Sequence, residues 1–131
     1  MSKEKKTALI ISTFFIVIIF SLSYCVYHGY SILENAFVEN KIVKEVKSID
    51  NSYRAVVFVR DTGATTRSSY QLSILKKGQD LENESGNVFI SYSEFDVMWK
   101  DNKTLKVRIR DKNEKIFKQL EKKDNIIILY E

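Results

Sequence analysis

Two patterns of hydrophobic and polar residues divide the chain. Residues 8–27 are apolar or carry a hydroxyl group, and they include no charged residue, glycine or proline. A helix of about 20 residues rises about 30 Å, which is the thickness of the hydrocarbon core of a bilayer. We therefore expect a transmembrane helix over residues 8–28 that places the chain in the lipid bilayer. From residue 42 onward, hydrophobic residues recur mainly at every second position, which predicts β-strands.

The residues at the two ends of the apolar segment predict its orientation. Lysines gather directly before it and are absent for a long stretch after it; they are Lys3, Lys5, Lys6 and then Lys41. The positive-inside rule therefore places residues 1–7 in the cytoplasm and the C-terminal part outside the cell membrane. Tyr24, Tyr27 and Tyr30 lie at the outer end, as expected for an interfacial aromatic belt.

Two alternative interpretations of the N-terminal segment stay open. Ser21 and Ser23 are small residues at suitable spacing for cleavage of a signal peptide, which would release a secreted domain. Residues 22–25 (LSYC) have the outline of a lipoprotein signal, in which Cys25 would carry the lipid. Tyr24 departs from this signal, because a small residue is required directly before the cysteine.

The remainder of the chain is expected to fold as one small β domain. Residues 29–41 are expected to be a juxtamembrane connector, and residues 42–131 an extracytoplasmic domain. We expect strands at 41–46, 53–60, 70–75, 88–90, 94–100, 105–110 and 126–130, and we assign the ambiguous segment 114–123 to strand rather than helix. With turn residues between these runs, the pattern predicts a mainly β fold, a small antiparallel β-sheet or sandwich of about seven or eight strands.

The periodicity also predicts which faces are buried. Residues 53–60 are apolar on both faces, which indicates a central strand. In residues 70–75, the apolar positions alternate with Gln71 and Ser73, which indicates a half-buried strand. The apolar run 126–130 is expected to be a buried strand.

Residues 94–110 give the clearest hairpin. Its inward-facing residues are expected to be Phe95, Val97, Trp99, Leu105, Val107 and Ile109. Lys106, Arg108 and Arg110 face outward and could form a patch that binds anions. Acidic residues on the neighbouring strand favour instead a solvated face on which opposite charges pair.

Composition and charge exclude several classes of function. The formal net charge is +4, of which +2 precedes the apolar segment, and the part from Ser31 onward has 18 basic and 16 acidic residues. This near balance argues against nucleic-acid binding. A single cysteine and a single histidine (His28) exclude an intramolecular disulfide and the usual zinc spacings, and we expect neither metal nor cofactor.

Residues 61–64 (DTGA) match the catalytic loop of retropepsin-like aspartic proteases. Such an enzyme needs two aspartates that share a proton across a dimer. Arg60 stands where those proteases carry an apolar residue, and a second signature does not follow. The alternative is a turn in which the Asp61 carboxylate caps backbone amides and Gly63 adopts positive φ. We assign no catalytic residue and expect that the protein is not an enzyme.

The loop between the second and third expected strands is the candidate binding loop. It combines hydroxyl groups with two arginines beside a rigid strand, and loops in that position often bind ligands. Its residues are Arg60, Asp61, Thr65, Thr66, Arg67 and Ser68.

Several segments between residues 42 and 110 carry a resemblance to a known family. The most specific is 60–66 (RDTGATT), and the others are 43–46, 48–58, 71–75, 83–89 and 97–102 with Leu105. Together they resemble a bacterial domain of unknown function, number 5412, found in small membrane-anchored proteins and lipoproteins. Family members often have cysteine at the position of Thr62 and a second cysteine shortly upstream, near Val38; a disulfide implied by that pattern is lost here.

The resemblance implies no catalytic role, because the family has no established activity. It also implies that the match to protease loops arose from threonine in place of cysteine. We expect a single-pass membrane protein whose β domain binds an envelope protein or a cell-wall component. A role as a tether in a larger membrane complex is the structural alternative.

Overall fold

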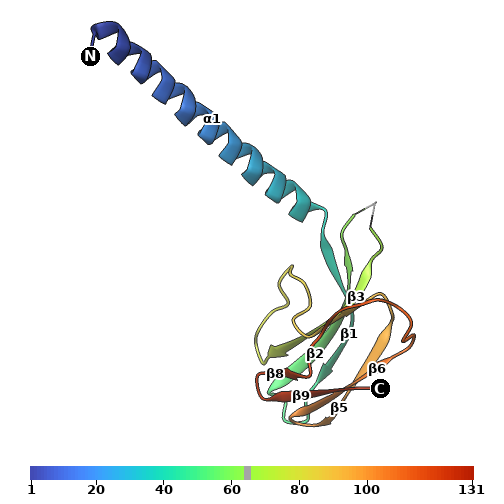
Figure 1. The fold of residues 1–131 in the computed structure, drawn as a ribbon. Coiled ribbons are helices and arrows are strands. Elements are labelled where there is room, and N and C mark those ends of the chain that lie inside the picture. The colour runs from blue at the N-terminus through green and yellow to red at the C-terminus, as the bar shows by residue number, and fades with distance from the viewer. Residues whose placement is uncertain (64–65) are drawn as a thin grey trace. The chain divides into compact units, whose positions relative to one another are not determined.

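A computed structural model of the chain describes residues 1–63 and 66–131. This part of the chain forms one helix and nine strands, and Figure 1 shows the fold. They are α1 (Lys3–Ala36), β1 (Glu39–Lys47), β2 (Tyr53–Asp61), β3 (Ser69–Lys76), β4 (Phe89–Ser91), β5 (Phe95–Asp101), β6 (Thr104–Ile109), β7 (Ile116–Gln119), β8 (Lys122–Lys123) and β9 (Ile126–Tyr130). The chain divides into two compact units, residues 1–36 and 37–131, which are described separately.

Helix α1 contains the whole predicted apolar segment. Its first 28 residues, Lys3–Tyr30, are long and apolar enough to cross a membrane, and a signal sequence near an N-terminus has the same properties. The Thr13 hydroxyl donates to the carbonyl of Leu9 (2.8 Å) in the preceding turn. This bond explains how the apolar segment tolerates the hydroxyl group of Thr13.

The expected connector is largely regular structure. Residues 29–36 form the last turns of α1, and β1 begins at Glu39. Two residues, Phe37 and Val38, therefore separate the helix from the first strand.

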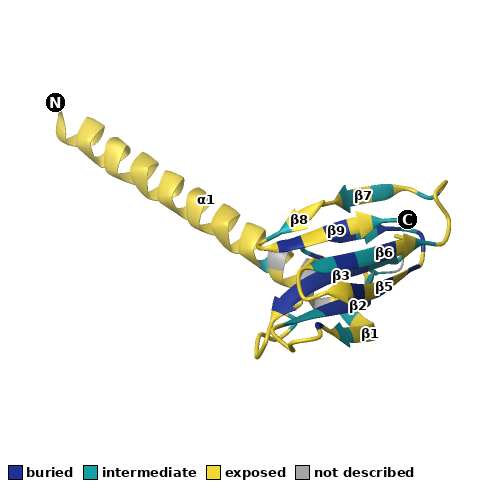
Figure 2. Cartoon of the chain, turned by 90° about the horizontal axis from the view of Figure 1, so that it is seen from below, coloured by how far each residue is buried: buried dark blue, intermediate teal, exposed yellow. Residues whose placement is uncertain are grey.

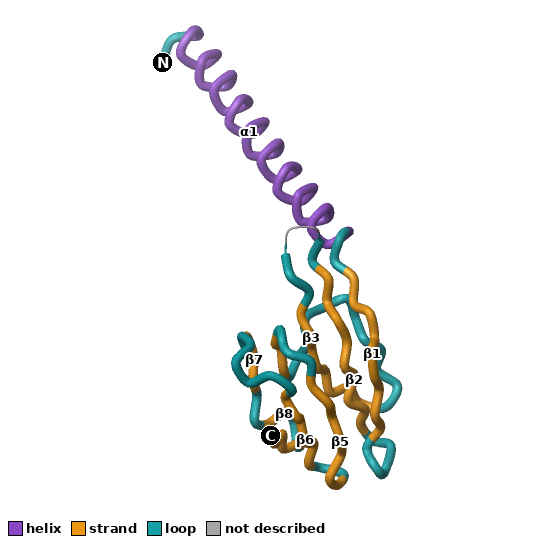
Figure 3. Tube along the Cα trace, turned by 90° about the vertical axis from the view of Figure 1, so that its right-hand side faces the viewer, coloured by secondary structure: helices purple, strands orange, loops and turns teal. Residues whose placement is uncertain are grey.

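The β domain contains two sheets in the part that the structure describes. The first has the strand order β1-β2-β3-β4-β7, and the second has the order β5-β6-β9-β8. The expected antiparallel arrangement is wrong for one pair, because β6 and β9 run parallel. Between these two strands the chain crosses to the first sheet as β7 and returns through β8, and such a crossover permits parallel pairing. Figure 3 shows β1, β2 and β3 side by side as long strands.

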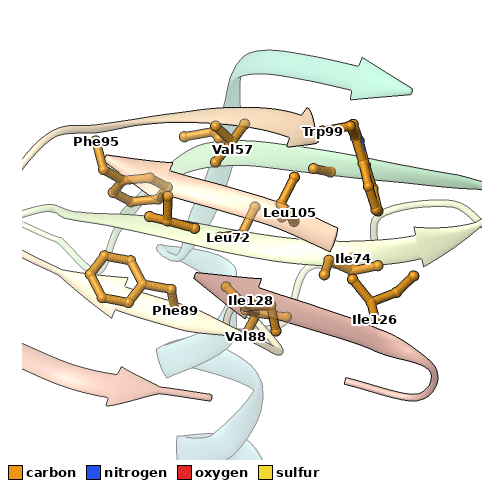
Figure 4. Close-up of a cluster of buried hydrophobic side chains, with 13 residues drawn as sticks. Val57, Leu72, Ile74, Val88, Phe89, Phe95, Trp99, Leu105, Ile126 and Ile128 are labelled. Atoms are coloured by element: carbon orange, nitrogen blue, oxygen red, sulfur yellow. The ribbon is translucent and has the colours of Figure 1, made fainter. Parts of the chain in front are cut away.

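The main hydrophobic core lies between the two sheets, which makes the domain a sandwich (Figure 4). The first sheet contributes Ala55, Val57, Leu72, Ile74 and Phe89, and the second contributes Phe95, Val97, Trp99, Leu105, Val107, Ile126 and Ile128. The rings of Phe89 and Phe95 meet edge to face, with centroids 4.9 Å apart. Burial of each larger side chain contributes about 1.5–3 kcal/mol. The inward-facing residues predicted for the hairpin are thus confirmed, with Ile109 partly buried.

The indole of Trp99 joins the edges of the two sheets. Its ring nitrogen donates to the carbonyl of Val46 in β1 at 2.9 Å, and the side chain is 8% exposed. Because β1 and β5 are the edge strands of different sheets, this bond fixes one corner of the sandwich.

Strand β2 is buried on both faces, as predicted, but the half-buried assignment of β3 is wrong. Gln71 and Ser73 are 4% and 3% exposed, and Figure 2 shows the buried stretch of β3 in dark blue. The segment 81–87 covers this face, where Leu81 packs on a second cluster of Val56, Phe58 and Leu75. The polar side chains bond to the covering backbone: Gln71 Oε1 accepts from the amide of Gly86 (2.6 Å), and Ser73 Oγ accepts from that of Asn87 (3.1 Å).

Gly86 is the point where the covering segment approaches β3 most closely. An ideal Cβ on Gly86 would lie 2.9 Å from the carbonyl oxygen of Leu72. Next to it, the side-chain amide of Asn87 donates to the carbonyl of Ile74 (3.1 Å) and accepts from the amide of Ile74 (2.9 Å). The absence of a side chain at Gly86 therefore permits the segment to pair with β3.

The C-terminal strands agree with one prediction and correct another. Residues 114–123 contain β7 and β8, so the choice of strand over helix is confirmed. Strand β9 was expected to be buried, but it alternates between buried and exposed residues, as Figure 2 shows. Ile126 and Ile128 enter the core, whereas Ile127 and Leu129 are 50% and 40% exposed because the outer face of the second sheet is uncovered.

Candidate functional site

The candidate binding loop begins with a turn around Asp61. Asp61 Oδ1 accepts a hydrogen bond from the amide of Gly63 (3.0 Å), and Gly63 has φ of +103°. The hydroxyl groups of Thr62 and Thr66 bond to each other across this turn. The alternative in which Asp61 caps a turn and Gly63 supplies positive φ is thus confirmed.

Arg60 is held by the elements beside the loop. Its guanidinium donates to Oδ1 of Asn40 in β1 (2.7 Å) and to Oδ1 of Asn83 (3.3 Å). The side-chain amide of Asn83 in turn donates to the carbonyl of Val38 (2.8 Å). Arg60 therefore links β2 to β1 and to the segment that covers β3, which is a structural role.

Arg67 lies at the other end of the loop and contacts a different partner. Two guanidinium nitrogens donate to the two carboxylate oxygens of Glu114, at 3.0 and 2.8 Å, in a fork-like pair. The guanidinium also lies 4.7 Å from the ring centroid of Tyr92. The hydrogen bond to Glu114 raises the pKa of Arg67 above its usual value. This arrangement ties the loop to the segment before β7.

The two arginines of the candidate loop therefore bind different neighbours. Thr66 is exposed, Ser68 is half-buried, and Thr65 lies outside the described residues. The Glu114 carboxylate partly compensates the charge of Arg67, whereas Arg60 donates to the neutral side chain of Asn40. A ligand site at this loop stays a prediction.

The charged side chains on the outward side of the hairpin form ion pairs, as expected for a solvated face. Arg110 contacts the carboxylate of Glu94 at 2.6 Å and that of Asp96 at 3.5 Å. Lys106 contacts Glu131 at 2.6 Å, and the hydrogen bond from Lys106 lowers the pKa of Glu131. The pairs to Glu94 and Asp96 follow from the acidic neighbours noted in the sequence, whereas Glu131 is a partner that strand periodicity did not indicate.

A groove among the described residues lies on the outward side of the same sheet. It has a volume of about 310 Å³, and Lys44, Asp96, Val97, Met98, Lys106, Arg108 and Glu131 line it. Register places Met98 opposite Lys106 and Lys106 beside Leu129, so the groove adjoins the exposed side chains of β9. We call the set Met98, Lys106, Arg108, Ile127, Leu129 and Glu131 the outer face. Sequence reasoning missed this surface because it assigned the run 126–130 to the interior.

The turn between β1 and β2, one of the segments that carry the family resemblance, is organised around Asp50. Its carboxylate accepts bonds from the amide and hydroxyl of Ser52 (3.1 and 2.8 Å) and from the hydroxyl of Ser48 (2.8 Å). These bonds, that from the Ser52 amide most strongly, lower the pKa of Asp50. Asn51 adopts positive φ (58°), which asparagine tolerates better than most residues. The motif thus has a structural explanation.

Among the described residues, no group of three or more His, Cys, Asp and Glu side chains is placed to hold a metal ion. The described part of the chain therefore gives no residue set on which to build metal chemistry.

Comparison with known proteins supports the resemblance seen in the sequence. The profile of a family of unknown function (DUF5412) matches residues 4–123, which include nearly all of α1 and the strands through β8. No curated protein and no solved structure matched the chain. Because the match covers most of the 131 residues, the chain belongs to the DUF5412 family of unknown function.

Proposed function

We propose that the chain is a single-pass membrane protein that carries a small β domain at the extracytoplasmic surface. There the domain binds another envelope protein or a cell-wall component. The observation that carries the proposal is α1, whose large apolar side chains are exposed along the helix, including Phe14, Phe15 and Phe20 at 66%, 60% and 73%. Contact of so many apolar groups with water is unfavourable, whereas a bilayer accommodates them.

Two further observations support this arrangement. The family match begins at residue 4, so the helix and the β domain occur together in the family profile. Lys3, Lys5 and Lys6 precede the apolar segment and favour a cytoplasmic N-terminus.

Binding is the better-supported role for the β domain. The charged side chains singled out from the sequence take part in structural contacts: Arg60 with Asn40, Arg67 with Glu114, and Asp61 with the Gly63 amide. Catalysis would require a reactive group with a matched proton acceptor, whereas binding requires only an accessible surface.

Protease treatment of intact cells tests the proposal. The chain carries a C-terminal epitope tag, and a matched version carries the tag before Met1. We expect protease to remove the C-terminal tag from the membrane fraction and to leave the N-terminal tag at its position in the cytoplasm. The membrane fraction and the culture medium are compared by blot.

Each alternative has its own outcome. A protected C-terminal tag together with a cleaved N-terminal tag would invert the orientation. A shortened chain with its C-terminal tag in the medium would show that a signal peptide is removed. A membrane-bound chain that is shortened in the wild type and keeps its N-terminal segment for Cys25→Ser would show processing at a lipid anchor on Cys25.

A further inference from the structure

The outer face of the second sheet presents aliphatic side chains to the solvent. Met98, Ile127 and Leu129 are 58%, 50% and 40% exposed, and they come from β5 and β9. Lys106 of β6 is the register neighbour of both Met98 and Leu129, so its aliphatic stem continues the apolar surface between them. Apolar exposure spread over adjacent strands in this way indicates an interaction surface.

Positive charge surrounds these aliphatic groups. Lys44, Lys100, Lys106, Arg108, Arg110 and Lys122 lie on or beside the face, and the carboxylates there are Glu94, Asp96 and Glu131. Glu131 contacts Lys106 (2.6 Å) and Arg108 (3.6 Å), Asp96 contacts Lys44 (3.6 Å) and Arg110 (3.5 Å), and Glu94 contacts Arg110 (2.6 Å). Six cations therefore accompany three carboxylates, and the excess positive charge remains for an anionic partner.

The strand that continues from α1 runs beside this face. β1 begins after the two residues Phe37 and Val38, and it contacts β5 through Lys44 and Asp96 and through the bond from Trp99 to Val46. Helix residues 29–36 and the two residues Phe37 and Val38 separate the expected membrane segment from β1, a path of at most about 20 Å. A surface tethered this closely meets the bilayer at an effective concentration of order millimolar or above, and weak adhesion suffices.

We propose that the outer face of the second sheet rests on the surface of the bilayer that holds α1. Met98, Ile127 and Leu129 enter the headgroup region, and the surrounding lysines and Arg108 bind phosphate groups of anionic lipids. The inference rests on the membrane anchor proposed above. Basic side chains around exposed aliphatic groups are typical of surfaces that bind anionic membranes.

A lipid surface fits this face better than a protein partner. Protein interfaces depend on aromatic and arginine anchors that fill pockets, whereas the apolar residues of the outer face are aliphatic. Fluid lipid headgroups adapt to such a groove without a side chain of matching shape. A second copy of the same face is disfavoured, because its excess positive charge would be opposed by an equal charge.

Single-cysteine labelling of the full chain tests the proposal. Cys25 is the only cysteine, so Cys25→Ser gives a background into which Met98→Cys or Ile127→Cys is introduced and labelled with the environment-sensitive fluorophore NBD. Ser85→Cys is the matched control, because Ser85 is exposed on the segment that covers the other sheet. The proteins are reconstituted into nanodiscs of phosphatidylcholine, with or without phosphatidylglycerol and with or without doxyl-labelled lipid.

We expect NBD at positions 98 and 127 to shift to shorter wavelength and to be quenched by doxyl lipid in the anionic nanodiscs. NBD at position 85 is expected to stay solvent-like. Lys100→Gln and Lys122→Gln each remove one positive charge beside the outer face, and each is expected to weaken docking about fivefold. High salt screens these charges and is expected to reduce the quenching by doxyl lipid, as the two lysine substitutions do.

The other outcomes separate the two proposals. Solvent-like emission at 98 and 127 in a protein that stays in the nanodisc would overturn the docking and leave the anchor intact. A wavelength shift without quenching by doxyl lipid would show contact with protein and would also overturn it. Equal quenching at position 85 would show unspecific insertion of the domain. A chain that is not retained in nanodiscs would remove the anchor, and the docking inference with it.

Discussion

Gly86 is the position at which a single methyl group should disturb the β domain most directly. The segment 81–87 lies over one face of β3, and Gly86 is where the two backbones come closest. We expect Gly86→Ala to destabilise the domain although alanine is small and apolar, because the added atom meets backbone rather than a flexible side chain.

The magnitude follows from the atoms around the added Cβ. It would lie 2.9 Å from the carbonyl oxygen and 3.1 Å from the nitrogen of Leu72, and 3.0 Å from Cβ of Gln71. Strand β3 is paired on both sides, with β2 and β4, so the segment must move away from it. That movement lengthens the bond from the Gly86 amide to Gln71 Oε1 (2.6 Å). Overpacking costs about 1–3 kcal/mol of stability, and the weakened hydrogen bond costs about 1 kcal/mol. Alanine also reduces the conformational entropy of the unfolded chain, which offsets about 0.5–1 kcal/mol of this loss.

The net expectation is a loss of about 2 kcal/mol in the free energy of unfolding, a large part of the stability of a small domain. Trp99 is the only tryptophan and is buried, so its fluorescence reports unfolding of the β domain in the full chain. Urea titration in detergent micelles should show the midpoint of Gly86→Ala lowered by about 1–2 M, given a slope of about 1–2 kcal/mol/M.

Ser85→Ala is the matched control, since Ser85 is exposed and its replacement should change stability by less than about 0.5 kcal/mol. If Gly86→Ala unfolds at the same urea concentration as Ser85→Ala, the close approach of segment 81–87 to β3 is not a constraint on the fold, and the reasoning fails.

Three further predictions concern other parts of the domain. Trp99→Phe removes the hydrogen bond to the carbonyl of Val46 and should lower the free energy of unfolding by about 1–2 kcal/mol, measured by circular dichroism in urea; wild-type stability would contradict this role. Burial raises the pKa of Tyr130 to about 12, so the stability contributed by its neutral form is complete below pH 10 and is lost as the pH rises toward 12. Tyr130→Phe should lack this loss in alkaline thermal unfolding, although it also loses the bond to the carbonyl of Leu120 (2.6 Å). Asp61→Asn retains an acceptor for the Gly63 amide and should leave both folding and any cellular phenotype unchanged; a lost proteolytic activity would instead favour an enzyme.

The sequence predicts those features that depend on local pattern. The hairpin of β5 and β6 follows from strict alternation around a turn, and the turn at Asp61 follows from an aspartate two residues before a glycine. The strand β2 is recognisable as central because both of its faces are apolar. The residues of each such pattern lie close together in the sequence, so these features can be predicted without knowledge of the fold.

The remaining features depend on residues far apart in the chain. Gln71 is buried because segment 81–87 covers it, and the hydroxyl and amide content of β3 alone indicates exposure. Ile127 is exposed because the outer side of its sheet is uncovered, although an apolar run normally indicates burial. In the candidate site, Arg60 bonds to Asn40 and Arg67 bonds to Glu114. These partners lie far apart in the sequence, so local periodicity cannot predict them.

The parallel pairing of β6 with β9 determines when the domain can fold during synthesis. β9 lies between β6 and β8 in the second sheet, and its Ile126 and Ile128 fill the core. The nascent chain therefore lacks an interior strand until residues 126–130 have emerged, and the sandwich closes only after that point. In the orientation proposed above, this order favours translocation in extended form, because the β domain does not fold around an incomplete core before residues 126–130 have been made.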